Sequence, residues 1–448
     1  MSTTPKSHRT YDLVGVGIGP SNLSLAALTA QEPGISAVFL DRKEAFDWHP
    51  GMMLPDADMQ VHWLKDLVTP VDPTNPHSFL AFLVETKRLY RLLVTGRTKV
   101  PRREFEQYCR WASERMDNLR FGVTTENIEW DGSAFLVHTT DGVLRARNVA
   151  AGTGLTAKLP QCAVGHDPER VFHAEQLLRK PRDFSGKRVA VVGGGQSGAE
   201  VVHYLLTSET QRPAKLLWGT RRANLLPLDD SPFVDELFLP DYSRYFHGLP
   251  EAEREDVVQR LRMASDGISL STLQDIYRRL YDLELLEGAG QACRVLLDQH
   301  LTSLTRTPGG LLTTWQPARG GDPVEEEVDV VVCATGYEHG MSDLLLGLKD
   351  RLALQHGLPV VRSDFSLDWD GPADNRIFVQ NAARREFGVA DPNLSLLAWR
   401  SAVIANSLLG RERYDTGSVS TALDWDSASS APEFHERSSG SSAAGQAA

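Results

Sequence analysis

Cysteine is scarce in this chain of 448 residues. The four cysteines form no CxxC pair and have no neighbouring histidines at the spacing of a metal site; they are Cys109, Cys162, Cys293 and Cys333. A disulfide framework, a zinc site and a redox pair of neighbouring cysteines are therefore excluded. We expect four reduced thiols, no bound metal and a cytoplasmic location.

Long apolar runs are also missing. No segment approaches the roughly 20 consecutive apolar residues that a membrane helix requires. Residues 1–10 lack the apolar centre of a signal peptide. We therefore expect no membrane partner.

Positive charge is in deficit, with a formal net charge of −12 at pH 7. Binding to a polyanion depends on Lys and Arg that neutralise phosphates, so general nucleic-acid binding is not expected. The charge only weakly favours cationic small molecules. The length predicts two or three domains, and a hydrophobic content of 41% is normal for a globular core.

Two glycine-rich segments stand out from this ordinary composition. The first, GVGIGPSNL, begins at Gly15, and the second, GGGQSGAE, begins at Gly193. Each follows a short apolar run and opens a stretch with helical character, which is the context of a dinucleotide-binding fingerprint. The glycines allow a tight turn and close approach of a pyrophosphate, while the helix N-terminus offers free N–H groups to the phosphates. Two dinucleotides are predicted.

The residue types after each fingerprint suggest which dinucleotide binds. The apolar run after the first segment ends at Asp41, whose carboxylate suits a ribose hydroxyl and therefore FAD or NAD. The corresponding run after the second ends at Arg221 and Arg222, whose guanidinium groups suit the 2′-phosphate of NADPH. A solvated strand end is the alternative interpretation of the two arginines.

The predicted fold class is α/β, with two Rossmann-like dinucleotide-binding domains, the first for FAD or NAD and the second for NADPH, and a small inserted helical subdomain. We assign residues 10–165 and 330–412 to the first domain, and residues 185–228 and 288–329 to the second. Residues 229–287, with a helical and aromatic pattern, form the subdomain. Residues 413–448, rich in Ser, Ala and Gly, are expected to be a disordered tail.

Several phrases resemble the flavin-dependent N-hydroxylating monooxygenases of siderophore biosynthesis, over roughly residues 10–412. Besides the first fingerprint they are WHPGM from Trp48, MQ at Met59 followed by LKDLV from Leu64, DDSPF from Asp229, ATGY from Ala334 and DPNLS from Asp391. Further segments look most similar to the lysine N6-hydroxylase branch; they are PTNP from Pro73, KRLYR from Lys87, REF from Arg103 and SDGI from Ser265.

The resemblance implies an FAD-binding first domain, a substrate-binding helical subdomain, and an enzyme that uses FAD, NADPH and O2 to hydroxylate the terminal primary amine of L-lysine. The oxygen would come from a C4a-hydroperoxyflavin, so the difficult chemistry belongs to the cofactor. The product would serve a hydroxamate siderophore or a natural product with an N–N bond. The family also suggests a homo-oligomer, specifically a tetramer.

Residue roles follow from matching positions. The resemblance places Gly15, Gly17, Gly19 and Pro20 at the FAD pyrophosphate, Asp41 near the ribose, and Gln60 and Leu394 near the flavin. The second fingerprint, with Gly193 and Gly195, binds NADPH, and Gln196, Ser197 and Arg221 match positions that meet it. Lys65 and Ser395 match substrate-contacting positions, although Lys65 could be a surface lysine and Ser395 a helix cap. Gln60 and Ser395 shape the pocket, and no side chain is assigned as catalytic.

Two departures from the family pattern leave the substrate open. Asp235 stands where the ornithine enzymes have a substrate-contacting asparagine, and its carboxylate suits either the α-ammonium of lysine or the second ammonium of a diamine. Phe387-Gly388 stands where His-Gly is expected. Hydroxylation of cadaverine, putrescine or L-ornithine therefore remains an alternative.

Two other functions share the nucleotide fingerprints. A Baeyer–Villiger or sulfur-oxidising monooxygenase would carry an FxGxxxHxxxW/Y signature before the second fingerprint, where this chain has VFHAE from Val171. A redox sensor that binds FAD and NADPH without hydroxylating anything would explain the fingerprints but not Lys65 or the Ser395 segment.

Overall fold

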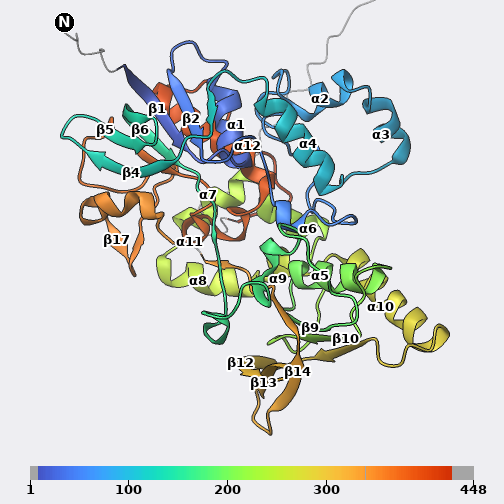
Figure 1. Ribbon diagram of the computed structural model, residues 1–448. Coiled ribbons are helices and arrows are strands. Elements are labelled where there is room, and N and C mark those ends of the chain that lie inside the picture. Colours follow the sequence, from blue (N-terminus) through green and yellow to red (C-terminus); the bar gives the residue numbers. More distant parts are fainter. Residues whose placement is uncertain (1–8, 339, 426–448) are drawn as a thin grey trace, which may run out of the picture.

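The computed structural model describes residues 9–338 and 340–425. One of its two larger units is built on a seven-stranded sheet, which lies in the upper half of Figure 1. The strand order is β3-β2-β1-β6-β5-β4, and β19 also pairs with β6. The strands are β1 (Thr10–Val16), β2 (Ala37–Asp41), β3 (Leu119–Phe121), β4 (Thr125–Trp130), β5 (Phe135–Thr139), β6 (Gly142–Ala151) and β19 (Ile377–Val379).

Strand β6 has two different neighbours along one edge. Its first half pairs antiparallel with β5, and its last three residues pair parallel with β19. The carboxyl ends of β1, β2, β6 and β19 consequently meet at one edge of the sheet, which is where ligands bind in open α/β sheets.

Helix α1 (Pro20–Thr29) packs between this sheet and α12 (Leu397–Leu409). Nearly every residue of α1 is buried, because its sequence PSNLSLAALT is apolar or small on all sides. Helices α2 (Phe79–Glu85), α3 (Leu89–Thr95) and α4 (Arg102–Ser113) extend the same unit. An aromatic cluster joins α2 to α4, through Phe79, Phe82, Tyr108 and Trp111.

The second sheet is entirely parallel, in the order β11-β10-β9-β15-β8. Its strands are β8 (Val171–His173), β9 (Arg188–Val192), β10 (Lys215–Gly219), β11 (Cys293–Leu296) and β15 (Val330–Cys333). Two predicted domain boundaries are therefore corrected. Strand β8 belongs to the second unit although it precedes residue 185, the predicted start of that unit. Strand β15 also belongs to the second unit, although the prediction places residues 330–412 in the first. The apolar sequence VVVC of β15 suits the buried centre of any parallel sheet, so its composition could not tell the two sheets apart.

Helices α5 (Gln196–Thr207) and α10 (Leu270–Tyr281) pack together beside the second sheet, and an antiparallel sheet of β12 (Gln299–Thr307), β13 (Gly310–Pro317) and β14 (Val324–Val328) completes this unit. Two small ladders pair β7 (Thr156–Ala157) with β16 (Tyr337–Glu338) and β17 (Leu354–Gln355) with β18 (Leu358–Pro359).

Residues 229–287 do not form the separate helical subdomain that was predicted. Helices α6 (Pro232–Asp235), α7 (Pro240–Gly248), α8 (Glu251–Arg260) and α9 (Met263–Asp266) lie between the two sheets in Figure 1, near α11 (Arg384–Phe387). Tyr242, Phe246 and Ala264 belong to the hydrophobic core of the first unit, whereas Ile276 of α10 belongs to that of the second. The segment is thus divided between two cores.

The predicted tail needs a similar correction. Residues 413–425 pack on the first unit, and Tyr414 is only 2% exposed. Its hydroxyl donates a hydrogen bond to the carbonyl of Leu28, 2.8 Å away. Residues 426–448, the rest of the predicted tail, lie outside the described residues. A single buried tyrosine in a polar stretch gives no periodicity, which is why the composition misled the prediction.

Candidate active site

The first glycine-rich loop connects β1 to α1 and has the geometry of a phosphate cradle. Gly17 has a φ of +86°, and a Cβ there would lie 2.4 Å from the carbonyl oxygen of Gly152. Gly19 is the N-cap of α1, which no side chain caps, and the space where its Cβ would stand is open. With Pro20 at N1, the uncapped helix start faces free space and fits a pyrophosphate group.

Gly15 has a different role, because it lies within β1. A Cβ there would overlap the ring of Phe39 on β2, 2.1 Å from its Cδ1 atom. This glycine therefore permits close strand packing beneath the loop. The close approach to the phosphates is left to Gly17 and Gly19.

Asp41 lies at the end of β2, directly beneath the first loop. Its Oδ2 accepts a hydrogen bond from the N–H of Ile18 at 2.7 Å, and its Oδ1 accepts one from the N–H of Lys43 at 2.9 Å. The buried carboxylate thus holds the loop in shape. It retains lone pairs for the predicted ribose contact, because a carboxylate offers about four acceptor positions.

The second loop connects β9 to α5 and repeats this geometry. Gly193 has a φ of +132°, and a Cβ there would lie 2.1 Å from the carbonyl oxygen of Ala334. Gly195 is the N-cap of α5, again without a side-chain cap, so the N–H groups of Gln196 and Ser197 open the helix. These residues fit the phosphates of a second dinucleotide in the same way.

The two arginines after β10 differ sharply in position. Arg221 is exposed, whereas Arg222 is half-buried beside the second loop, with its Nη2 3.9 Å from the place of a Gly195 Cβ. The Nη1 of Arg222 is buried and has no hydrogen-bond partner among the described residues. Burial and the charges of Arg262 and Arg221 lower the pKa of Arg222 from its usual value, and the carboxylate of Asp266 partly opposes this shift, so a bound phosphate would further stabilise the guanidinium charge. Sequence reasoning favoured Arg221, because both arginines follow the end of β10 and no pattern within the chain distinguishes them.

A chain of polar contacts joins the two units at the start of α5. Arg102 of α4 donates two hydrogen bonds to the carboxylate of Glu200, at 2.6 and 2.8 Å. Glu200 also accepts one from Gln196, whose Oε1 accepts the N–H of Ser269 at 2.7 Å. The Nε2 of Gln60 lies 3.5 Å from the Oγ of Ser269. Gln60 and Gln196, predicted at different nucleotides, therefore meet through one serine.

The predicted substrate residues come together from three distant parts of the chain. The Nζ of Lys65 lies 3.5 Å from the Oγ of Ser395. Burial lowers the pKa of Lys65, and the carboxylate of Asp235 partly opposes this shift. Burial in turn raises the pKa of Asp235, and Lys65 partly opposes it. The site thus combines an ammonium, a hydroxyl and a carboxylate.

Asp66, which sequence reasoning missed, holds the loop that carries Lys65. Its buried carboxylate accepts hydrogen bonds from the N–H groups of Val68 at 2.9 Å, Thr69 at 2.6 Å and Phe79 at 2.6 Å. The last of these ties the loop to the start of α2. An aspartate surrounded by Lys, Leu and Val gave no sign of a bond to a residue as distant in sequence as Phe79.

The segment of Leu394 and Ser395 is held by a different buried aspartate. Asp391 accepts a hydrogen bond from the Nη1 of Arg400 on α12 at 2.8 Å, and both side chains are almost fully buried. The Oδ1 of Asn393 accepts the N–H of Ser395 at 2.8 Å. Helix α12 begins at Leu397 without a side-chain cap, so the Ser395 hydroxyl does not cap it. Leu394 lies beside Ser395 in the same short turn.

Comparison with known proteins identifies the family. The family model described as L-lysine 6-monooxygenase/L-ornithine 5-monooxygenase matches residues 9–339. This chain belongs to that family. It is 42% identical to L-lysine N6-monooxygenase of Escherichia coli, over 93% of this chain and 99% of the relative.

Two solved structures of the lysine/ornithine monooxygenase type match over most of the chain. The FAD-bound cadaverine monooxygenase DfoA of Erwinia amylovora has a TM-score of 0.86 and 30% identity, covering 93% of this chain and 99% of its own. The ornithine N-hydroxylase of Kutzneria sp. 744, with reduced FAD, NADP+ and L-ornithine, has a TM-score of 0.82 and 30% identity, covering 90% and 99%. The predicted family, fold class, enzyme class and pair of cofactors are thereby confirmed.

Phe387, the departure from the expected His-Gly pair, has a structural explanation. Its ring is buried and stacks on Phe365, with centroids 4.2 Å apart, and lies 4.9 Å from His247. The following Gly388 has a φ of +72°, and its Cβ would lie 3.1 Å from the ring of Phe246. This family member therefore fills the position with core packing.

In the described part of the chain, no helix is long and apolar enough to cross a membrane.

Proposed function

We propose that this enzyme N-hydroxylates the terminal amine of L-lysine, with consumption of NADPH and O2. The observation that carries the proposal is the contact of the Lys65 Nζ with the Ser395 Oγ, within the electrostatic influence of Asp235. An amino acid presents a carboxylate and an α-ammonium, and these are the complements of Lys65 and Asp235. The relative from Escherichia coli, an L-lysine N6-monooxygenase, supports this choice.

The protein's own contribution is binding and orientation. When bound in the first unit, FAD supplies the oxygen-transfer chemistry after reduction by NADPH. Lys65 and Ser395 fix the far end of the substrate, which leaves its terminal amine free to extend away from them. That amine has an ordinary pKa of about 10.4 and must lose its proton to react as a nucleophile, so a site that excludes water favours the reactive form.

A diamine such as cadaverine is the second candidate, and Asp235 is the observation that favours it. Its carboxylate could bind a second ammonium as well as it binds an α-ammonium. A diamine lacks the carboxylate that Lys65 would pair with, however, and its ammonium would meet the ammonium of Lys65. The cadaverine monooxygenase among the solved relatives keeps this candidate in consideration.

The decisive experiment compares L-lysine, L-ornithine, cadaverine and putrescine as substrates of the FAD-loaded protein, with hydroxylamine product as the readout. We expect product chiefly from L-lysine. Product from diamines alone would contradict the lysine proposal and make Asp235 the centre of recognition. NADPH oxidation without hydroxylamine from any of the four would contradict both.

Substitution of Lys65 gives a first quantitative prediction. Lys65→Ala removes a charge-assisted contact worth about 1.5–3 kcal/mol, so the KM for lysine should rise by roughly 10- to 100-fold while the KM for NADPH changes by less than about 2-fold. The exposed Lys349 provides a matched control, because Lys349→Ala removes the same charge from the short helix Asp343–Arg351, which packs against β4. An unchanged KM for lysine would rule out the role assigned to Lys65.

A homotetramer in the cytoplasm, supplying a siderophore or an N–N natural product pathway, completes the proposal. Exposed apolar side chains after and along α10 support self-association, with Tyr277 76%, Leu285 68% and Leu286 69% exposed. The four separate free cysteines suit a reducing compartment. Light scattering of the purified protein would show a single monomer mass if the tetramer is wrong.

A further inference from the structure

Residues 413–425, which we call the C-terminal strap, leave the end of α12 and cross helix α7. Tyr414 anchors the beginning of the strap in the core. Farther along, Arg244 of α7 donates hydrogen bonds to the carbonyls of Thr416 and Gly417, at 2.8 and 2.9 Å. Asp241 of the same helix accepts one from the N–H of Val419 at 2.8 Å. The strap is thus attached to α7 at defined points.

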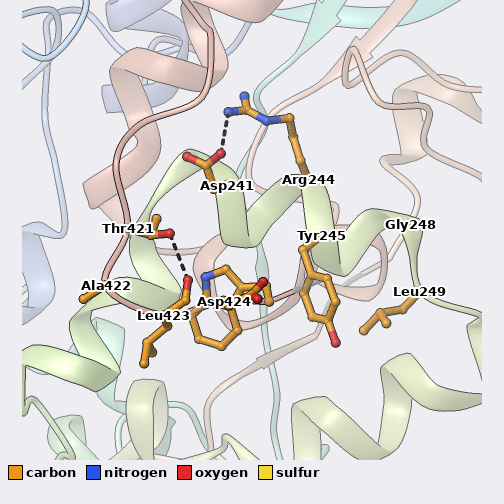
Figure 2. A pocket seen from close by; sticks show the side chains of 10 residues that line it. Asp241, Arg244, Tyr245, Gly248, Leu249, Thr421, Ala422, Leu423 and Asp424 are labelled. Atoms are coloured by element: carbon orange, nitrogen blue, oxygen red, sulfur yellow. Dashed lines mark hydrogen bonds and ion pairs between the residues drawn. The ribbon is translucent and has the colours of Figure 1, made fainter. Parts of the chain in front are cut away.

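The last contacts of the strap converge on Glu236. Its Oε1 accepts the N–H of Ala422 at 2.8 Å, and its Oε2 accepts the N–H of Leu423 at 3.0 Å. Between the strap and α7 lies a cavity of about 800 Å³, which Figure 2 shows from close by. Residues 421–425 of the strap line this space. Hydrogen bonds, together with the ring of Trp425 4.8 Å from that of Tyr242, therefore set the position of the strap.

Glu236 directly follows Asp235, the carboxylate that the proposed function assigns to the α-ammonium of lysine. Helix α6, which ends at Asp235, contains no fully buried residue, and only the partly buried Val234 packs against the core. The next buried side chains are Leu237 and Phe238. The position of Asp235 consequently depends on these three apolar contacts and on the two hydrogen bonds that Glu236 accepts from the strap.

We propose that Glu236 is a positioning residue, through which the C-terminal strap holds Asp235 in place for the α-ammonium of the substrate. This inference rests on the proposed function, because it assigns a partner to a substrate-binding carboxylate. According to this proposal, the backbone N–H groups of Ala422 and Leu423, near the end of the strap, contribute to substrate recognition indirectly, through Glu236 and Asp235.

Glu236→Gln is the direct test, because a glutamine side chain has one acceptor oxygen and its NH2 group opposes the second N–H. We expect the KM for lysine to rise by about 5- to 10-fold, with the KM for NADPH within about 2-fold of the unmodified protein. Hydrogen exchange at the amides of Ala422 and Leu423 should become faster. Glu253→Gln, an exposed residue on α8, is the control and should change neither quantity.

A pair of truncations keeps the proposal testable should Glu236→Gln fold poorly. Ending the chain after Ser420 removes the two donors and should raise the KM for lysine as Glu236→Gln does. Ending it after Trp425 keeps the strap and should not. An unchanged KM for lysine in both Glu236→Gln and the shorter truncation would overturn the positioning role while leaving lysine hydroxylation intact. Absence of hydroxylamine with the unmodified protein would instead overturn the proposed function, and this inference with it.

Discussion

The two glycine-rich loops have the same backbone design but different surroundings. Both place a positive-φ glycine against a neighbouring carbonyl and end in a helix that no side chain caps. Beneath the first loop, Asp41 uses its carboxylate to bind the loop itself. Beside the second, Arg222 presents a buried guanidinium nitrogen without a partner among the described residues. We therefore expect the loop to provide the phosphate cradle and the residues after the next strand to determine which nucleotide binds.

Substitution of the two positive-φ glycines should give the largest effects and separate the loops. Gly17→Ala combines an unfavourable φ with a clash against Gly152, which together cost about 3 kcal/mol or more, so FAD affinity should fall by roughly 100-fold or more. Gly193→Ala should leave the affinity for FAD unchanged and lower the affinity for NADPH by a similar factor. Flavin absorbance titration and the KM for NADPH measure the two losses.

The control for these substitutions is Gly34→Ala, since Gly34 has open space around it and no positive φ. It should leave both affinities unchanged. Equal loss of FAD in Gly17→Ala and Gly193→Ala would mean that the loops do not act separately, and would break the comparison.

The arginine pair should give an intermediate effect. Arg222→Ala should raise the KM for NADPH by roughly 10- to 100-fold, because a charge-assisted contact to phosphate is worth about 1.5–3 kcal/mol, and it should affect NADH much less. Arg221→Ala, a matched change at an exposed position, should have a smaller effect. A larger increase in the KM for NADPH in Arg221→Ala than in Arg222→Ala would show that Arg221 binds the 2′-phosphate, as predicted from the sequence.

Much of the site could be predicted because its signals are local or are carried by family phrases. The glycine loops depend on backbone freedom at single positions, which the residue type reveals. The meeting of Lys65 with Ser395 followed from the resemblance, since no pattern within the chain connects two residues so far apart.

What escaped prediction depends on long-range packing. Strand β15 is as apolar as any strand of the first sheet, and only the tertiary structure places it beside β9. The direction of the Arg222 side chain and the hydrogen bond between Asp66 and Phe79 are set by neighbours more distant in sequence. The strap escaped for a related reason, because its hydrogen bonds with Arg244 and Glu236 use backbone groups that every sequence possesses.

The smallest expected effect concerns the residues that support each loop from the next strand. Asp41→Asn keeps one acceptor oxygen and loses the charge, so FAD affinity should fall by about 10-fold, in line with one charge-assisted hydrogen bond. The corresponding residue of the second unit is Thr220, whose hydroxyl accepts the N–H of Arg222 at 3.1 Å. Thr220→Val removes this neutral bond while keeping the shape, so NADPH affinity should fall by only about 3-fold. Binding titrations of both nucleotides would measure the two losses. If Thr220→Val lowered the affinity for NADPH more than Asp41→Asn lowers the affinity for FAD, the second loop would depend more than the first on the residue that supports it. That result would contradict the contrast between Asp41, which shapes its own loop, and Arg222, which is left to bind the nucleotide.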